Sequence, residues 1–336
     1  MFIPNPMNIS DFNFSNSRSK IHALVEGISQ LIMHGKLLPG DNLPSINEMS
    51  DLLKVSRDTV FKAYKELRHL QLIESNPMKG YYITGRVKRI LLLLDTYSSF
   101  KQDLYKQFTT NLSSDYKVDL IFHQYNEHLF ETIVRDSAGK YSMYVVMNFS
   151  NEVLSPSLKK IPAQQLLLLD FGNFDKTDYN YICQDFDQSF YDCLMSVREQ
   201  IAKYRNLCFV FPTEHSHPVS AIDAFHRFGD ATNRKTSVHR TVDDRIGLEP
   251  STLYIGIVRE DIVRIVKSAD EQGLILGEDI GLLIYNDEPL LEIIKNGISS
   301  ISIDFGLMGK KAAGFVMKRM PVQEYLPTKI IVRSSF

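Results

Sequence analysis

The 336-residue chain is poor in cysteine and has no tryptophan. Its three cysteines, Cys183, Cys193 and Cys208, are odd in number and lack the close spacing of metal ligands. A sparse, odd set excludes the paired framework of a small disulfide-rich secreted domain. We therefore expect three buried thiols in a reducing compartment, and a cytoplasmic protein.

Long apolar runs are also absent. The best candidate for a membrane segment, residues 90–94, ends at Asp95 and is far shorter than the roughly 18 residues that a spanning helix needs. Residues 1–17 are polar and lack the basic start and apolar stretch of a secretion signal. We expect a flexible N-terminal arm and no membrane partner.

The net charge of −2 is small but unevenly distributed. Residues 1–88 carry 11 Lys and Arg against 8 Asp and Glu, whereas the remainder carries 27 against 32. This mild basicity permits binding to nucleic acid without establishing it.

Residues 18–85 show three helix patterns followed by two short apolar runs. Apolar side chains recur at helical spacing over residues 21–32. Ser45 and Ser56 stand where the second and third helices should begin, and a Ser side chain at such a position accepts a hydrogen bond from the first turn. Three helices and a hairpin in this order predict a winged helix-turn-helix, whose third helix enters the major groove of DNA.

The third helix opens with short polar side chains and one Arg, which can reach base edges and phosphates. A helix N-terminus is itself a favourable phosphate site, and a small residue at the hairpin tip lets the backbone approach the minor groove. The residues that we expect at DNA on these grounds are Ser56, Arg57, Asp58, Thr59, Lys62, Lys79 and Gly80.

Four segments of this region, residues 35–45, 55–60, 63–67 and 79–83, together resemble the GntR family of bacterial transcription regulators. The resemblance implies a homodimer on a palindromic double-stranded operator. It also places three more residues in the candidate interface. They are Ser45, then Asn47, which stands where the family usually has Arg, and Tyr81, which follows the wing-tip glycine.

From Val87 onward, short apolar runs alternate with helical stretches. The runs are nearly continuous, as in strands that are buried on both faces of a parallel sheet. Their alternation with helices predicts a doubly wound α/β architecture over residues 86–336. The expected strands are residues 90–94, 118–122, 143–147, 166–169, 207–211, 253–258 and 280–284.

This region resembles the effector domain of LacI-type repressors and periplasmic sugar-binding proteins, most clearly over residues 273–287 and 299–312. The resemblance implies two α/β lobes with a ligand cleft between them. Chimeras of these two families include repressors of arabinose use, which makes a pentose or deoxyhexose the expected effector. Two departures imply an altered ligand geometry: Ala221 stands where the LacI pattern has Arg, and an expected Asn-Asp pair is missing near Arg259.

Ligands of open α/β sheets bind at the carboxyl ends of the strands, so polar residues that follow strands are the candidates for the site. Carboxylates and Arg make charge-assisted hydrogen bonds to sugar hydroxyls, and aromatic rings cover the apolar face of a sugar. Helix caps, plain turns and core packing remain alternative roles for these residues. The candidates are Asp95, Phe100, Asn148, Phe149, Asp170, Arg259, Glu260, Asn286, Asp287 and Phe305.

Enzyme motifs are not apparent. The chain lacks a phosphate-binding loop, a dinucleotide fingerprint and a nucleophile elbow, so we expect neither an enzyme nor a cofactor. His215 and His217 are the one hint of a metal site, but no third ligand is near them in sequence, and a polar loop explains them better.

The hypothesis from sequence is a repressor of a sugar-utilisation operon, controlled by a monosaccharide or a sugar phosphate. Two alternatives stay open at this point. In one, the second domain has lost its ligand and serves as a dimerisation scaffold. In the other, an enzyme is fused to a DNA-binding segment.

Overall fold

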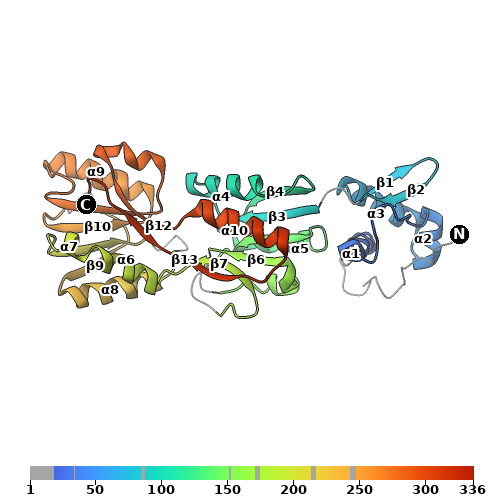
Figure 1. Cartoon of the computed structure of the whole chain (residues 1–336), viewed down its shortest axis with the longest axis horizontal. Helices are drawn as coiled ribbons and strands as arrows, with labels where there is room; N and C mark the ends of the chain where they lie inside the picture. Colours follow the sequence, from blue (N-terminus) through green and yellow to red (C-terminus); the bar gives the residue numbers. More distant parts are fainter. Residues whose placement is uncertain are drawn as a thin grey trace.

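The computed structural model describes residues 19–33, 35–84, 88–150, 153–170, 175–212, 217–242 and 247–336. The arm expected at residues 1–17, the centre of the expected domain junction and His215 lie outside these ranges. Figure 1 shows an N-terminal domain at one end, a first α/β lobe in the middle and a second lobe at the other end. No helix in the described ranges is both long and apolar enough to cross a bilayer.

The N-terminal domain has the predicted winged helix-turn-helix order. Ser45 and Ser56 cap the second and third helices as expected, and Ser45 forms a capping box with Glu48. The Tyr64 hydroxyl donates to the Pro44 carbonyl oxygen at 2.8 Å and so ties the third helix to the loop before the second. The elements are α1 (Lys20–Met33), α2 (Ile46–Leu53), α3 (Arg57–His69), β1 (Ile73–Asn76) and β2 (Gly80–Ile83).

The first lobe is a parallel sheet with strand order β13-β7-β6-β5-β3-β4. Helices α4 and α10 pack together on one face, and α5 packs on the other (Figure 1). The elements are β3 (Lys88–Leu94), α4 (Ser99–Thr110), β4 (Tyr116–Phe122), α5 (Glu127–Ser137), β5 (Met143–Met147), β6 (Leu166–Leu169), β7 (Asn180–Gln184), α10 (Phe305–Lys318) and β13 (Gln323–Leu326).

The second lobe has strand order β14-β12-β11-β10-β8-β9, parallel except for the β12–β14 pair. Helices α6, α7 and α8 cover one face, and α9 packs on the other. The elements are α6 (Gln188–Ser196), α7 (Arg198–Ile201), β8 (Asn206–Val210), α8 (Ser220–Thr232), β9 (Lys235–His239), β10 (Thr252–Gly256), α9 (Arg259–Gln272), β11 (Ile280–Tyr285), β12 (Ser299–Ser302) and β14 (Lys329–Ile331).

The chain passes between the lobes three times, from β7 to α6, from β12 to α10 and from β13 to β14. Short multiple connections of this kind permit hinge closure around a ligand. All seven runs that were predicted as strands are strands. The edge strands β9, β13 and β14 were not predicted, because their residues are mostly half-buried or exposed and lack a continuous apolar run.

Candidate nucleic-acid interface and ligand cleft

Helix α3 presents a polar face that is free of the domain core. Val60, Ala63, Tyr64 and Leu67 face inward. Successive turns of the opposite face carry exposed side chains, because residues four apart in a helix share a face. That face consists of Arg57, Asp58, Phe61, Lys62, Lys65 and Arg68.

The first turn of α3 is held by its own side chains. Ser56 Oγ accepts from the Thr59 amide at 3.1 Å and lies 2.7 Å from Thr59 Oγ1. Asp58 and Lys62 form an exposed ion pair at 2.7 Å, so each partly neutralises the other. Arg57 is exposed beside them, which makes it the cation best placed to approach DNA at this end of the helix.

The wing turns sharply between β1 and β2. Asn76 Oδ1 accepts from the Met78 amide at 2.8 Å, and Gly80 has φ of +73°, a conformation that favours glycine. Lys79 is exposed at this tip, whereas Tyr81 is half-buried with its ring 4.7 Å from that of Tyr64. The geometry thus leaves the wing tip open and gives Tyr81 a packing role.

The two remaining candidates lie at the start of α2. Ser45 is engaged in the cap of α2, and Asn47 is exposed in the first turn of that helix. The sequence reasoning passed over Phe61, which is 51% exposed on α3, and Met78, which is 95% exposed on the wing. In the sequence, Phe61 falls outside the helical spacing of the buried residues of α3, which could have identified it, whereas no sequence pattern marks Met78.

The N-terminal domain rests against the first lobe through α1 and α3. Lys140 pairs with Glu66 of α3 at 3.0 Å, and both side chains are partly buried. Gly139 has φ of +70°, and a Cβ there would lie 2.6 Å from Glu26 Cγ of α1. Strand β3 leads from this junction, where Arg89 pairs with Asp119, to Asp95 at its far end.

Asp95 lies in the wall of a cavity of about 260 Å³ between the two lobes. The first lobe provides most of the polar wall, and the crossing after β7 and the second lobe provide the rest. The lining residues are Asp95, Thr96, Phe100, Lys101, Tyr125, Met147, Asn148, Asp170, Gln184, Phe186, His217, Ile257, Val258 and Asn286.

The Asp95 carboxylate is fully engaged within the first lobe. One oxygen accepts from Lys101 Nζ and from the Thr96 amide, and the other accepts from the Tyr125 hydroxyl at 2.7 Å. Asp95 and Lys101 are both buried. A buried ion pair of this kind needs such additional hydrogen bonds to offset desolvation. Asp95 therefore positions Lys101 and Tyr125 rather than presenting a free oxygen to the cavity.

Four lining residues carry a buried polar atom that has no hydrogen-bond partner in the described part of the chain: Asp170 Oδ1, Asn148 Oδ1, Gln184 Nε2 and His217 Nε2. Desolvation raises the pKa of Asp170 to about 6, although the Lys101 ammonium acts in the opposite direction. Desolvation lowers the pKa of His217 to about 3, so its ring is neutral. Unpaired buried polar atoms are costly, and a bound polar molecule would satisfy them.

Backbone strain gathers in the same cavity. Tyr125, Asp170 and Asn286 all have positive φ, at 54°, 50° and 65°, which residues other than glycine seldom adopt. Each of them follows a strand, β4, β6 or β11. Such conformations often cluster at ligand sites, where the surrounding structure holds them.

Five predicted ligand residues line the cavity: Asp95, Phe100, Asn148, Asp170 and Asn286. The other five do not line it: four of them contact other parts of the structure, and the fifth is exposed. Phe149 and Phe305 pack against Phe130 and Phe100, Asp287 pairs with Arg333, Arg259 pairs with Glu288, and Glu260 is exposed on α9.

The sequence reasoning missed Lys101, Tyr125, His217, Ile257 and Val258. Tyr125 follows β4, so the rule of examining strand ends could have found it. Lys101 lies inside the first turn of α4, where no local pattern marks a buried ammonium. In the described ranges no three His, Cys, Asp or Glu side chains group as metal ligands would.

A polar bridge joins the lobes beside the crossings. Ser99 of α4 donates to Glu288 of the second lobe, and Arg259 contacts both side chains. Glu288 is 10% exposed, whereas Arg259 is 58% exposed. The position of Arg259 after β10 thus correctly indicated that the residue lies between the lobes, but Arg259 does not line the cavity.

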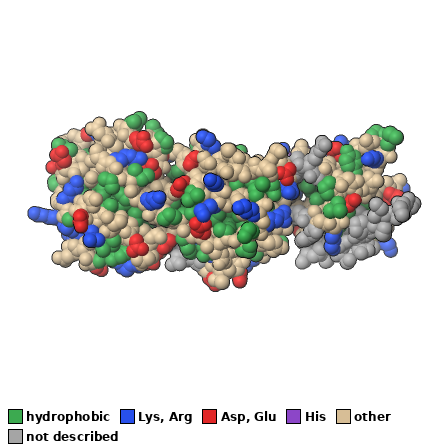
Figure 2. All heavy atoms as spheres, viewed as in Figure 1, with side chains coloured by type: hydrophobic (Ala, Val, Ile, Leu, Met, Phe, Trp, Pro, Cys, Tyr) green, Lys and Arg blue, Asp and Glu red, His purple; other side chains and the backbone are tan. Residues whose placement is uncertain are grey.

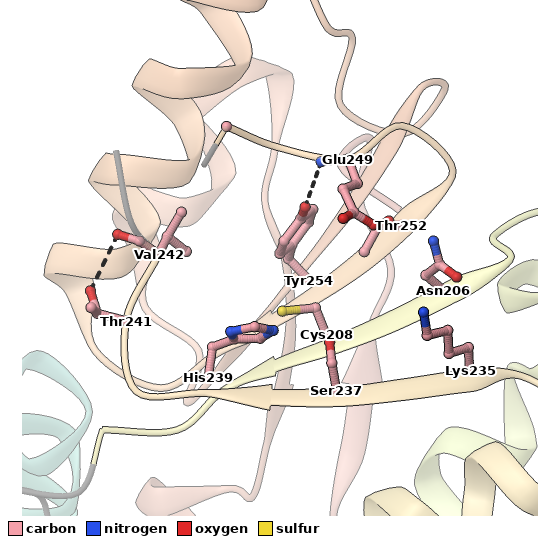
Figure 3. A pocket seen from close by; sticks show the side chains of 11 residues that line it. Asn206, Cys208, Lys235, Ser237, His239, Thr241, Val242, Glu249, Thr252 and Tyr254 are labelled. Atoms are coloured by element: carbon pink, nitrogen blue, oxygen red, sulfur yellow. Dashed lines mark hydrogen bonds between the residues drawn. The ribbon is translucent and has the colours of Figure 1, made fainter. Parts of the chain in front are cut away.

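A second cavity, of about 250 Å³, lies on the second lobe alone and is lined by β8, β9 and β10 together with Thr241, Val242, Gly247 and Glu249. Figure 3 shows that Cys208, Ser237, His239 and Tyr254 surround it, with the Tyr254 hydroxyl accepting from the Glu249 amide. Several of its lining side chains, such as those of Lys235 and His239, are exposed. We therefore assign it no role.

Comparison with known proteins supports the two-part organisation. Residues 20–83 match the profile of the family described as bacterial regulatory proteins, gntR family, and residues 208–336 match a periplasmic binding protein-like domain. The chain is 35% identical over 69 residues to the HTH-type transcriptional repressor YtrA of Bacillus subtilis, which covers 20% of this chain and 53% of that repressor. The chain thus spans about half the length of this relative.

Solved structures resemble the two lobes at low sequence identity. The trehalose repressor from Escherichia coli is 14% identical, with a TM-score of 0.60, over 73% of this chain and 99% of its own. A LacI family transcriptional regulator from Lactobacillus casei with bound sucrose is also 14% identical, with a TM-score of 0.60, over 74% of this chain and 100% of its own. The chain therefore joins a winged helix-turn-helix domain of the GntR family to a periplasmic-binding-protein-like domain with the fold of LacI-type regulators.

Proposed function

We propose that the chain is a homodimeric, DNA-binding transcription repressor of a sugar-utilisation operon and acts in the cytoplasm. A small molecule, most simply a monosaccharide, binds between the lobes and controls affinity for a palindromic operator. The observation that carries this proposal is the cavity enclosed by both lobes, with its unpaired buried polar atoms, on the same chain as a GntR-type DNA-binding domain.

The exposed residues of α3 and the wing support the DNA-binding part. Arg57 at the start of α3 and Lys79 at the wing tip are both exposed. Figure 2 shows Lys and Arg interspersed with Asp and Glu over the visible faces of both lobes, with no large region of one sign. Binding is therefore expected to depend on this local set rather than on a global positive field.

The junction supports the coupling between the sites. Strand β3 ends at Leu94, directly before Asp95 in the cavity, and begins beside the surface that carries Gly139 and Lys140. Closure of the lobes around a ligand would act on this surface and so on the spacing of the two recognition helices in a dimer. Ligand and operator affinities are then reciprocally coupled.

The test begins with selection of a preferred duplex from a random DNA pool by the full chain. Fluorescence anisotropy then measures its affinity with and without each sugar of a panel. Arg57→Ala should weaken specific binding by about tenfold or more, because a good base or phosphate contact contributes ~1–3 kcal/mol. Arg135→Ala, which removes an exposed cation of the first lobe, is the matched control and should leave affinity unchanged.

A sugar that changes operator affinity supports the proposal, and a decrease identifies an inducer of a repressor. Equal losses for Arg57→Ala and Arg135→Ala would contradict the assigned interface. Operator binding that no small molecule alters would contradict the sensing role and favour a dimerisation scaffold.

A further inference from the structure

The charges in the wall of the inter-lobe cleft indicate whether its ligand is neutral or anionic, an inference that rests on the function proposed above. Sugars reach a sensor either unmodified or as phosphate esters, and the two differ by about 1.5–2 negative charges near neutral pH. A buried charge is costly unless an opposite charge and hydrogen bonds accompany it. The cations in the cavity wall therefore decide between the two forms.

Lys101 is the one Lys or Arg among the described lining residues, and its charge is already compensated. Its ammonium pairs with Asp95 inside the lobe, and both side chains are at most 10% exposed. Asp170 adds a second carboxyl group to the same wall. With His217 neutral, the described wall carries no net positive charge, and it becomes negative when Asp170 ionises.

The atoms left to bind a ligand suit hydroxyl groups. Asn148 donates through its amide nitrogen to two backbone carbonyl oxygens, so only its Oδ1 faces the ligand as an acceptor. Asp170 Oδ1 is a second acceptor that a hydroxyl donor would satisfy, and His217 Nε2 can donate or accept according to its tautomer. Gln184 Nε2 is a neutral donor, so the set offers both donors and acceptors, as a hydroxyl group requires. A phosphate group, which is an acceptor with no free cation to meet it, fits this set poorly.

The volume of the cavity limits how many sugar rings it can hold. Its volume of about 260 Å³ lies just under the ~300 Å³ lower end of sites for drug-sized ligands. The second-lobe wall contributes the apolar side chains Ile257 and Val258, and Phe100 contributes a ring. These surfaces match the apolar face of one sugar ring.

We infer that the inter-lobe cleft takes an uncharged, single-ring polyol and rejects its phosphate ester, and that the Asp95–Lys101 ion pair sets this discrimination. Lys101 would otherwise be an unpaired buried ammonium and an attractive phosphate site. Asp95 thus acts as a specificity-determining residue through Lys101, without contacting the ligand.

Isothermal titration of the full chain tests this inference. The probes are arabinose, xylose, ribose, fucose and glucose, the phosphate esters of arabinose, ribose and glucose, and inorganic phosphate. The wild-type chain should bind one or more free sugars and bind the matching ester at least tenfold more weakly. Asp95→Asn should improve ester affinity relative to free sugar by at least tenfold, because it leaves Lys101 unpaired.

The double variant Asp95→Asn with Lys101→Met restores a wall without a free cation and should lose that gain. Asp119→Asn breaks the Arg89 ion pair in the same lobe but outside the cavity, and it should leave the preference unchanged. If Asp95→Asn does not unfold cooperatively, Asp170→Asn gives a second route. It removes the other carboxyl group and should raise relative ester affinity severalfold.

Equal or tighter binding of the ester by the wild-type chain overturns the inference while leaving the sensor proposal intact. The same holds if folded Asp95→Asn binds sugar with an unchanged preference. If the wild-type chain binds no sugar and no ester, the proposed sugar-sensing function fails, and this inference fails with it.

Discussion

The two lobes share a parallel-sheet architecture but contribute different chemistry to the cleft. The first lobe places two carboxyl groups, an ammonium, a phenol and two amides in the cavity wall, whereas the second places one neutral ring, one amide and two aliphatic side chains there. A wall rich in fixed polar groups can orient a ligand before closure. A mainly apolar wall gains most of its contact only after closure, when it excludes water.

The difference suggests that recognition and closure are divided between the lobes. The first lobe adjoins the DNA-binding domain, through Glu66–Lys140 and the start of β3, and also holds the polar half of the site. The second lobe reaches the DNA-binding domain through the first lobe in this arrangement (Figure 1). Substitutions in the two lobes should therefore have unequal effects, which the following experiments measure.

The largest expected effect is on acid stability of the first lobe. His123 is fully buried, its Nε2 lies 3.1 Å from the Met147 carbonyl oxygen, and desolvation lowers its pKa to about 4. Its ordinary pKa of 6.5 holds in the unfolded chain, so the unfolded state binds the proton first as pH falls. Stability is present above pH 6.5 and is lost between about pH 6.5 and 4, by on the order of 2–3 kcal/mol.

His123→Gln keeps a donor near Met147 and removes the titration, so it should flatten the loss of stability measured by urea unfolding over that pH window. Asp170 acts with the opposite sign: its raised pKa penalises folding above about pH 6, and the penalty fades as pH falls toward 3.8. Asp170→Asn is therefore the comparison variant and should steepen the acid loss. An unchanged pH profile in His123→Gln would contradict the burial argument.

The next largest effect concerns ligand affinity across the two walls. Asp170→Ala in the first lobe should weaken binding of the cognate sugar by roughly 10- to 150-fold, because a hydrogen bond to a charged group contributes ~1.5–3 kcal/mol. Asn286→Ala in the second lobe should cost about tenfold or less, as expected for a neutral hydrogen bond. Isothermal titration measures both.

A larger loss for Asn286→Ala than for Asp170→Ala would reverse the assignment of recognition to the first lobe. Circular dichroism and cooperative thermal unfolding of both variants show whether either loss comes from misfolding. Operator binding without sugar is the internal control, since neither residue lies near α3 or the wing.

The smallest expected effect concerns the bridge between the lobes. Glu288→Gln removes the negative charge of the side chain that accepts hydrogen bonds from Arg259 and Ser99. Because Arg259 is largely exposed, the contact between the lobes should weaken by only about 0–1 kcal/mol. Sugar affinity should fall no more than about fivefold, and small-angle X-ray scattering should show a slightly larger radius of gyration without ligand. A loss beyond tenfold would mean that the bridge, rather than the first-lobe wall, dominates closure.

Local pattern was sufficient for the DNA-binding domain. Ser45 and Ser56 cap helices in the structure as the sequence predicted, and the helical spacing of apolar residues separated the buried face of α3 from the exposed one. Caps, turns and helix faces depend on residues that are close in sequence, so no knowledge of the rest of the chain was needed. The apolar runs likewise predicted the central strands of both sheets.

The cleft depended on contacts that sequence does not show. Asp95 and Asp170 were predicted from their places after strands, but only the structure shows that Lys101 and Tyr125 occupy the first carboxylate and leave Asp170 Oδ1 without a partner. Arg259 also follows a strand and was predicted for the same reason, but its ion pair with Glu288 keeps it outside the cavity.

The order of the domains, the helix caps, the central strands and the residues that follow them could be predicted from the sequence, because each of these depends on neighbours along the chain. The tertiary structure alone decided which side chains meet across the cleft, which charges cancel and which polar atoms stay unpaired. Those outcomes depend on how helices pack on each sheet and how three crossings set one lobe against the other.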